Sequence, residues 1–174
     1  MKLSILITLL NEELVLAQTH AAISAQLEDM LGKDLSDYEI LYIDDGSNDR
    51  TFELIEGIAK GNDRVKYIRF SRNFGRESGI LAGFKYATGD AVMVMDGDLQ
   101  HPPYLIPLFL EAYKEGYDIV SGQRTRDGES FVGSTFARLF YFLSNKSMDV
   151  HLTDGKSELR LLSRKAINAF VSMP

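Results

Sequence analysis

The sequence lacks cysteine, an excess of positive charge and any long apolar run, and each absence argues against a class of protein. With no cysteine among 174 residues, disulfides and thiolate metal sites are excluded. A formal net charge of −6 argues against a general nucleic-acid binder, which would show a basic face. No stretch reaches the roughly 20 apolar residues of a membrane-spanning helix. We therefore expect a soluble or peripheral chain.

Two further patterns are missing. No G-x-G-x-x-G follows the first apolar run, which argues against a dehydrogenase. No internal repeat or low-complexity linker divides the chain, and 45% hydrophobic residues suffice for one core. We interpret residues 1–174 as a single domain. Because the sequence ends soon after its last expected helix begins, we also expect a C-terminal truncation.

Apolar runs that alternate with helical patterns predict the fold. The expected strands are Leu3–Leu10, Tyr38–Ile43, Val65–Phe70, Ala91–Met95 and Tyr117–Ser121, followed by a short apolar segment, Leu159–Leu162, and a last helix, Arg164–Ser172. Asn11 is predicted to cap the helix after the first strand, and Ser47 or Asn48 the helix after the second. The alternation predicts an α/β fold, a mostly parallel sheet with helices on both faces in three layers.

The most informative stretch is AVMVMDGDLQHPP, Ala91 to Pro103. An apolar strand ends at once in Asp96, Gly97 and Asp98, and parallel sheets bind ligands at this edge. If the backbone stays extended, the two carboxylates point the same way. Mg²⁺ is commonly held by one or two carboxylates plus substrate phosphates, so the stretch indicates a cation and nucleotide site. A plain turn is the alternative, because Asp and Gly favour turns.

Two other loops carry polar groups after strands. Asp44-Asp45-Gly46-Ser47-Asn48-Asp49 fails the EF-hand spacing, which leaves a ligand loop or an ordinary turn. Arg69, Arg72 and Arg76 put positive charge beside a helix start, which favours an anion site. The alternative is a solvated loop with Arg72 or Arg76 paired to Glu77.

Aromatic residues recur from Phe131 to Asn145 at helical spacing. Phe136, Phe140 and Leu143 form a stripe that is typical of a core-facing helix. Leu139 and Phe142 widen the apolar area, so contact with lipid is the alternative.

Four stretches together resemble glycosyltransferase family 2, which has the GT-A fold: Asn11-Glu12-Glu13, Asp44-Asp45-Gly46-Ser47, Arg72-Asn73-Phe74-Gly75, and Asp96-Gly97-Asp98-Leu99-Gln100-His101-Pro102. Within the family, the sequence is similar to dolichol-phosphate mannose synthases and bacterial polyprenyl-phosphate glycosyltransferases. The resemblance implies a metal-dependent, inverting transfer from a UDP- or GDP-sugar to a polyprenyl phosphate. It also implies peripheral membrane contact at the cytoplasmic face, and a role in cell-envelope polysaccharide synthesis.

The resemblance assigns roles to individual residues. The base and ribose pocket is implied at Thr8, Leu10, Glu12 and Asp44, and the donor set also includes Asp45, Arg72 and Gly97. Ribose, diphosphate and a Mg²⁺ or Mn²⁺ ion are implied at Asp96 and Asp98, with Gln100 completing the metal shell. The lipid phosphate is implied at Arg124 and Arg138, with Arg160 near the acceptor and Glu158 as base if the acceptor is a hydroxyl.

The chain departs from the family pattern at its base pocket. Thr8 and Leu10 stand where the family usually has Pro and Tyr, so a ring that packs on the base is missing. Two alternatives therefore stay open beside the polyprenyl-phosphate enzyme: a family 2 enzyme with a hydroxyl acceptor, and a non-catalytic nucleotide-binding domain.

Overall fold

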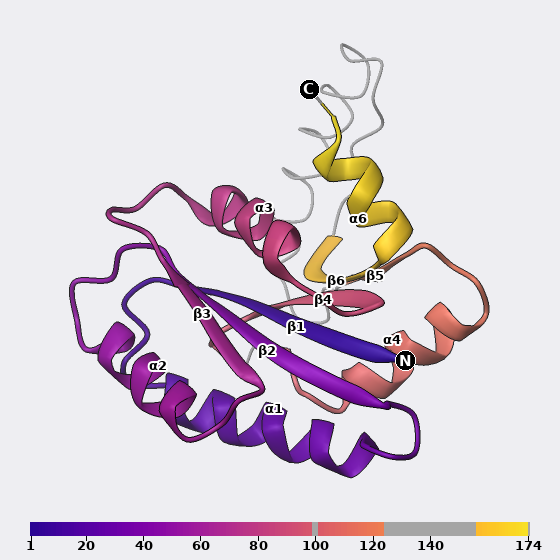
Figure 1. Cartoon of the computed structure of the whole chain (residues 1–174), viewed down its shortest axis with the longest axis horizontal. Helices are drawn as coiled ribbons and strands as arrows, with labels where there is room; N and C mark the ends of the chain where they lie inside the picture. The colour runs from indigo at the N-terminus through magenta and orange to yellow at the C-terminus, as the bar shows by residue number, and fades with distance from the viewer. Residues whose placement is uncertain (99–100, 124–155, 174) are drawn as a thin grey trace, which may run out of the picture. The chain divides into compact units, whose positions relative to one another are not determined.

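The structure, a computed structural model, describes residues 1–98, 101–123 and 156–173 (Figure 1). The strands in these ranges are β1 (Lys2–Leu9), β2 (Asp37–Asp44), β3 (Val65–Arg69), β4 (Ala91–Asp96), β5 (Ile119–Gln123) and β6 (Lys156–Ser163). The helices are α1 (Leu16–Met30), α2 (Thr51–Lys60), α3 (Arg76–Tyr86), α4 (Leu105–Lys114) and α6 (Arg164–Val171).

The chain forms two compact units, Met1–Val120 with Glu158–Pro174, and Ser121–Ser157. The five helices of the described ranges all lie in the first unit. The predicted helix Phe131–Asn145 lies outside the described residues.

The strands form one sheet in the order β3-β2-β1-β4-β6-β5. β1 pairs in parallel with β2 and β4, and β2 pairs in parallel with β3, which confirms the predicted mostly parallel sheet. β6 runs antiparallel to β4. The sequence indicated only a short apolar segment there, because a single strand that returns without a following βα unit breaks the alternation used for prediction.

Helices cover both faces of the sheet, with α1, α2 and α4 on one face and α3 and α6 on the other (Figure 1). Alternate residues of β4 supply the two cores: Met93 and Met95 pack with α1 and α4, while Val92 and Val94 pack with α3 and α6. The three-layer α/β prediction is confirmed. Gly83 allows α3 to lie close to β1, since a Cβ there would be 2.2 Å from Cδ1 of Leu6.

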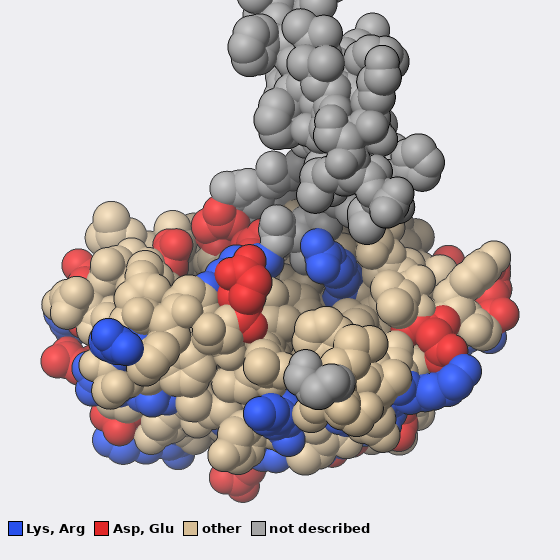
Figure 2. All heavy atoms as spheres, turned by 90° about the horizontal axis from the view of Figure 1, so that it is seen from above, with Lys and Arg blue, Asp and Glu red and all other residues tan. Residues whose placement is uncertain are grey.

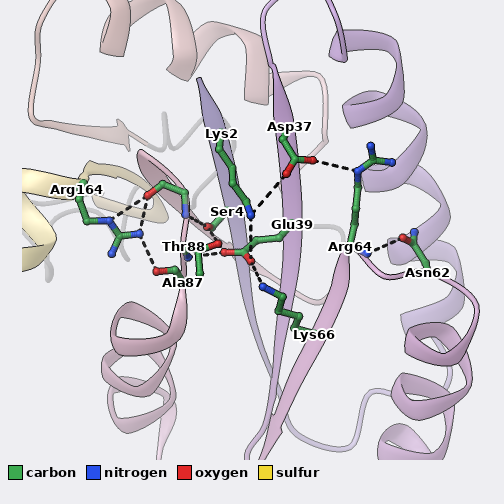
Figure 3. Close-up of polar contacts among 11 residues, drawn as sticks. Lys2, Ser4, Asp37, Glu39, Asn62, Arg64, Lys66, Ala87, Thr88 and Arg164 are labelled. Atoms are coloured by element: carbon green, nitrogen blue, oxygen red, sulfur yellow. Dashed lines mark hydrogen bonds and ion pairs between the residues drawn. The ribbon is translucent and has the colours of Figure 1, made fainter.

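The amino-terminal edge of the parallel strands contains a buried polar network around Glu39 of β2 (Figure 3). Its Oε1 accepts hydrogen bonds from Ser4 Oγ and the Thr88 amide, both at 2.6 Å, and its Oε2 accepts one from Lys66 Nζ at 2.8 Å. Arg164 of α6 donates to the Gly89 carbonyl, also at this edge. The network ties β1, β2, β3 and the loop after α3 together.

Candidate functional site

The carboxyl ends of three parallel strands meet at one edge of the sheet. Thr8 is the register partner of Asp96, and Leu9 is the partner of Asp44. Each strand therefore delivers its following loop to the same place, as open α/β sheets do at their ligand sites.

The loops after β1 and β2 hold each other through side chains that the sequence suggested as helix caps. Asn11 has φ 58°, and its amide donates to Ser47 Oγ at 2.9 Å. Its Oδ1 accepts from the Asn48 amide at 2.9 Å. α1 begins only at Leu16, and neither α1 nor α2 has a side-chain cap. The predicted capping roles are wrong, because these groups bond across the two loops instead of along their own helices.

Asp44 ends β2 as a fully buried carboxylate. Its Oδ1 accepts from the Ser47 amide at 3.2 Å, and Nε of Arg69 lies 3.5 Å from Oδ2. Oδ2 receives no hydrogen bond from the described residues. A buried carboxylate oxygen without a hydrogen bond is costly, and such a group in a ligand site is a ready acceptor for an N–H or O–H donor.

Asp45 shapes the wall of the site. Its two oxygens accept from the backbone amides of Phe74 and Gly75, at 2.7 and 2.9 Å. Gly46, at φ +76°, lies so close to the neighbouring loop that a Cβ would be 2.5 Å from the Arg72 carbonyl carbon. The loops after β2 and β3 are therefore held together by these contacts, and both Asp45 oxygens take part in them.

The Asp96–Asp98 segment turns immediately after β4. Gly97 and Asp98 lie in a turn, so the extended backbone considered from the sequence is wrong here. The buried Thr19 of α1 donates to the Gly97 carbonyl at 2.7 Å, and a Cβ on Gly97 would be 2.2 Å from Leu9 Cδ2. The contacts with Thr19 and Leu9 thus hold the turn against α1 and β1. The carboxylates of Asp96 and Asp98 still reach one cavity.

Both oxygens of Asp96 have cationic or imidazole neighbours. Nη2 of Arg76 lies 2.8 Å from Oδ1, and Nδ1 of the buried His101 lies 3.2 Å from Oδ2. Asp98 is half-buried beside it. Pairing with Glu77 was the alternative for Arg76, and its guanidinium instead reaches Asp96 at the end of β4.

A cavity of about 280 Å³ lies at this edge, and it is lined by Thr8, Leu9, Leu10, Glu12, Asp45, Asn73, Gly75, Arg76, Asp96, Gly97 and Asp98. Negative charge gathers in it. Burial first, and then the charges of Asp98 and Asp49, raise the pKa of Glu12. A cation in the cavity would relieve this repulsion.

The donor set of the cavity fits a divalent metal held jointly with phosphates. Carboxylate oxygens are the ligands that Mg²⁺ and Mn²⁺ accept, and Mg²⁺ needs only one or two of them. In the described residues no group of three His, Asp or Glu side chains converges as a self-sufficient cluster. Asp96 and Asp98 both line this cavity, and Arg76 and His101 flank Asp96.

The structure separates the predicted site residues into groups. Seven of them line the cavity: Thr8, Leu10, Glu12, Asp45, Asp96, Gly97 and Asp98. Asp44 is buried rather than lining it, Arg72 stacks over Phe74 at 4.8 Å, and Arg160 lies in a neighbouring groove. Gln100, Arg124 and Arg138 fall outside the described residues, and of Glu158 only the backbone is described. Roles at all these positions stay predictions.

Sequence reasoning gave no individual role to Thr19 or His101. The contact of Thr19 could not be found from a local pattern, since Thr19 lies 78 positions from Gly97, whereas His101 contacts Asp96 within the motif itself. Arg76 was noticed only as one of three loop cations, and its place at the start of α3 was the available signal.

The face shown in Figure 2 carries acidic and basic side chains interspersed with each other. In the part of the chain that the structure describes, no helix is long and apolar enough to cross a membrane.

Comparisons with known proteins identify relatives. The family model described as Glycosyl transferase family 2 matches residues 4–170. CsbB of Bacillus subtilis, which is named as a glycosyltransferase, is 53% identical over 137 residues, 79% of this chain and 42% of CsbB. The undecaprenyl-phosphate 4-deoxy-4-formamido-L-arabinose transferase of Aeromonas hydrophila is 34% identical over 169 residues, 97% of this chain and 51% of that protein. The chain spans about half the length of these curated relatives.

A solved structure confirms the GT-A fold. The mannosyltransferase PcManGT from Pyrobaculum calidifontis, in complex with GDP-Man and Mn²⁺, aligns with a TM-score of 0.66. The alignment covers 99% of this chain and 47% of that one at 18% identity.

Proposed function

Because the chain belongs to glycosyl transferase family 2, we propose that it transfers a sugar from a nucleotide-diphosphate donor to a polyprenyl phosphate. The observation that carries this proposal is the cavity where Asp96, Asp98 and Glu12 gather beside the buried Asp44. The similarity to an undecaprenyl-phosphate sugar transferase supports the acceptor class.

The donor nucleotide is proposed to enter between the first two loops. Thr8, Leu10 and Glu12 line that side of the cavity, and Oδ2 of Asp44 lacks a hydrogen bond. An N–H of the base is the donor that would complete Asp44, once the pocket wall over it opens. Arg69 Nε lies 3.5 Å from that oxygen and forms an ion pair with it, without donating a hydrogen bond.

The diphosphate is proposed to lie over the Asp96–Asp98 turn. Asp98, with Asp96 and Gln100 in support, would hold a Mg²⁺ or Mn²⁺ ion, which when bound neutralises charge on the leaving diphosphate. Arg76 holds Asp96 in place at 2.8 Å and sets the edge of the cavity. The hydrogen bond from Thr19 Oγ1 to the Gly97 carbonyl fixes the position of this turn relative to α1.

The reaction follows from the chemistry of the acceptor. A phosphate monoester has a second pKa near 6, so its oxygen is largely ionised at neutral pH. That oxygen attacks the anomeric carbon, a carbon–oxygen bond to the acceptor forms, and the bond to the nucleotide diphosphate breaks with inversion. Positioning by cations then contributes more than a general base. The lipid acceptor implies that the protein works at a membrane surface.

The test is a donor panel with a matched pair of variants. UDP- and GDP-sugars are offered with undecaprenyl phosphate and either Mg²⁺ or Mn²⁺, and product lipid is measured. Asp98→Asn is expected to lower transfer by about 10²–10³-fold, because it weakens the hold on the cation that would neutralise the leaving group. Asp63→Asn, at an exposed position in the turn before β3, serves as the control and should not change the rate.

Two results would contradict the proposal. Transfer by Asp98→Asn at the wild-type rate in the presence of a chelator would remove the metal role. Transfer to a saccharide hydroxyl but to no prenyl phosphate would replace the acceptor.

A further inference from the structure

Arg69 contacts both the buried carboxylate of Asp44 and the ring of Phe52 on α2. It is the register partner of Asp44 in the β2–β3 pair, and its Nε lies 3.5 Å from Oδ2 of that carboxylate. Its guanidinium carbon also lies over the Phe52 ring, 4.1 Å from the centroid. A cation over an aromatic face is attracted by the quadrupole of the ring. The same guanidinium is therefore held by a carboxylate and by a ring.

The Phe52 ring is itself positioned by contacts between α2 and β3. Tyr67, two residues before Arg69 on the same strand, meets it edge to face, with ring centroids 5.5 Å apart. The Tyr67 hydroxyl donates to Oε1 of Glu56, one turn further along α2, at 3.3 Å. Tyr67 and Arg69 point to the same face of β3, because side chains alternate along a strand. Phe52 is thus an aromatic platform, set by its neighbours, on which Arg69 stacks.

The ion pair with Arg69 leaves one oxygen of Asp44 available. Arg69 offsets the buried charge, yet Oδ2 accepts no hydrogen bond from the described residues, while Oδ1 accepts one from the Ser47 amide. A charge-assisted hydrogen bond between an arginine and a carboxylate is normally about 2.7–2.9 Å long, so Nε stops short of one here. A buried acceptor whose charge is offset but which receives no hydrogen bond is suited to an N–H of a ligand.

We propose that Phe52 and Arg69 are positioning residues for nucleotide recognition. Phe52 holds the Arg69 guanidinium at ion-pair distance from Asp44 but short of a hydrogen bond, so that Oδ2 remains open to the base. The inference rests on the proposed function, in which Asp44 accepts an N–H of the base. Neither residue contacts the nucleotide in this arrangement, because Arg69 acts on Asp44 and Phe52 acts on Arg69.

The opposite edge of the sheet offers a matched control (Figure 3). Arg64, directly before β3, lies over the Tyr38 ring at 4.9 Å, and its Nε lies 3.2 Å from Oδ1 of Asp37. The two arginine side chains are similarly exposed, 50% for Arg69 and 40% for Arg64. Arg64 therefore has the same kinds of partner as Arg69, at an edge where no nucleotide is proposed to bind.

The test is a double-mutant cycle on the intact protein. Wild type, Arg69→Gln, Asp44→Asn and the double variant are titrated calorimetrically with UDP, with GDP, and with ribose 5-diphosphate, which has no base. We expect Arg69→Gln to weaken binding of the preferred nucleotide by about tenfold in the wild-type background and by less than about twofold in the Asp44→Asn background. Binding of ribose 5-diphosphate should not change, because the effect passes through the base acceptor.

The role of the ring is tested separately. Phe52→Leu keeps an apolar side chain but removes the ring face, and loss of a cation–π contact should weaken nucleotide binding by about two- to fivefold. Phe52→Tyr keeps the ring face and should bind like wild type, as should Arg64→Gln. Urea unfolding checks that each variant is folded under the conditions of the titration.

Several results would overturn the inference. An equal loss on Arg69→Gln in both backgrounds would mean that Arg69 contacts the nucleotide itself, and an equal loss for ribose 5-diphosphate would mean that its charge attracts phosphate. Phe52→Tyr as weak as Phe52→Leu would remove the role of the ring, and Arg64→Gln as weak as Arg69→Gln would make the effect a general one of charge.

The inference and the proposed function fail in different ways. Wild type that binds neither UDP nor GDP contradicts both the inference and the nucleotide donor. Wild type that binds a nucleotide and shows the expected coupling between Arg69 and Asp44, but transfers no sugar, contradicts the proposed function and supports the inference.

Discussion

At the amino-terminal edge of the sheet both oxygens of the buried Glu39 receive hydrogen bonds (Figure 3), whereas at the opposite edge Oδ2 of the equally buried Asp44 receives none from the described residues. The two carboxylates belong to one strand, five positions apart. The carboxylate of Glu39 accepts hydrogen bonds from Lys66 and Ser4 of neighbouring strands. The second has only Arg69 at 3.5 Å and the Ser47 amide.

The difference agrees with the proposed function, in which β2 contributes to stability at its amino end and to nucleotide binding at its carboxyl end. Burial alone would raise the pKa of Glu39, but hydrogen bonds from Lys66, Ser4 and Thr88 outweigh it and lower the pKa to about 2. At the carboxyl end, the pKa of Glu12 is raised instead, through burial and the charges of Asp98 and Asp49. The first edge satisfies its charges internally, and the second gathers charge that a ligand would satisfy.

Neutralising Glu39 should give the largest effect on stability. A shift from 4.5 to about 2 corresponds to roughly 3 kcal/mol of stabilisation at neutral pH. We expect Glu39→Gln to lower the free energy of unfolding by about this amount in urea titrations, with little change in nucleotide affinity. Glu111→Gln, an exposed glutamate on α4, is the control. If Glu39→Gln lowered nucleotide affinity but left the free energy of unfolding unchanged, Glu39 would not have the stabilising role assigned to it here.

The same residue predicts a pH dependence. Because the pKa of Glu39 is lower in the folded chain than its usual 4.5, the unfolded chain binds more protons between those two pKa values. The stabilisation is therefore complete above about pH 4.5 and is lost as the pH falls toward 2. The difference in unfolding free energy between wild type and Glu39→Gln should shrink across this window. A difference that stays constant would mean that the charge of Glu39 is not its cause.

Asp44→Asn should have the opposite effect to Glu39→Gln, with a larger loss of nucleotide affinity than of stability. A hydrogen bond to a charged acceptor contributes about 1.5–3 kcal/mol, so we expect nucleotide affinity to fall by about thirtyfold. The free energy of unfolding should change by less than for Glu39→Gln, because the substitution removes a buried charge that is only partly compensated. Calorimetric titration with UDP and GDP measures the first effect, and urea unfolding measures the second. Equal destabilisation by the two variants would mean that Asp44 is a structural group like Glu39.

The sequence predicted the elements that depend on local patterns. Apolar runs that end in polar residues located β1, β2 and β4 to within a residue or two, and the strand ends located Asp44 and Asp96 at one edge.

What could not be predicted depends on contacts between distant residues. Asn11 is a residue type that commonly caps helices, but its hydrogen-bond partners are Ser47 and Asn48 on another loop. Glu39 sits in an apolar strand, where only the fold brings Ser4 and Lys66 to it. A strand pattern specifies which face a residue occupies, and the neighbouring strands decide whether its charge is satisfied.

The smallest expected effect tests how firmly the carboxyl edge is held. Thr19→Val keeps the shape of the side chain but removes the hydroxyl that donates to the Gly97 carbonyl at 2.7 Å. Such a hydrogen bond contributes about 1 kcal/mol, so the Mn²⁺ concentration for half-maximal transfer should rise by up to about tenfold while the KM for the acceptor stays constant. Thr19→Ser retains the hydroxyl and should restore the wild-type Mn²⁺ dependence. If Thr19→Ser is as impaired as Thr19→Val, the methyl group and core packing hold α1 against the turn, and the carboxyl edge depends on the same buried contacts as the rest of the sheet.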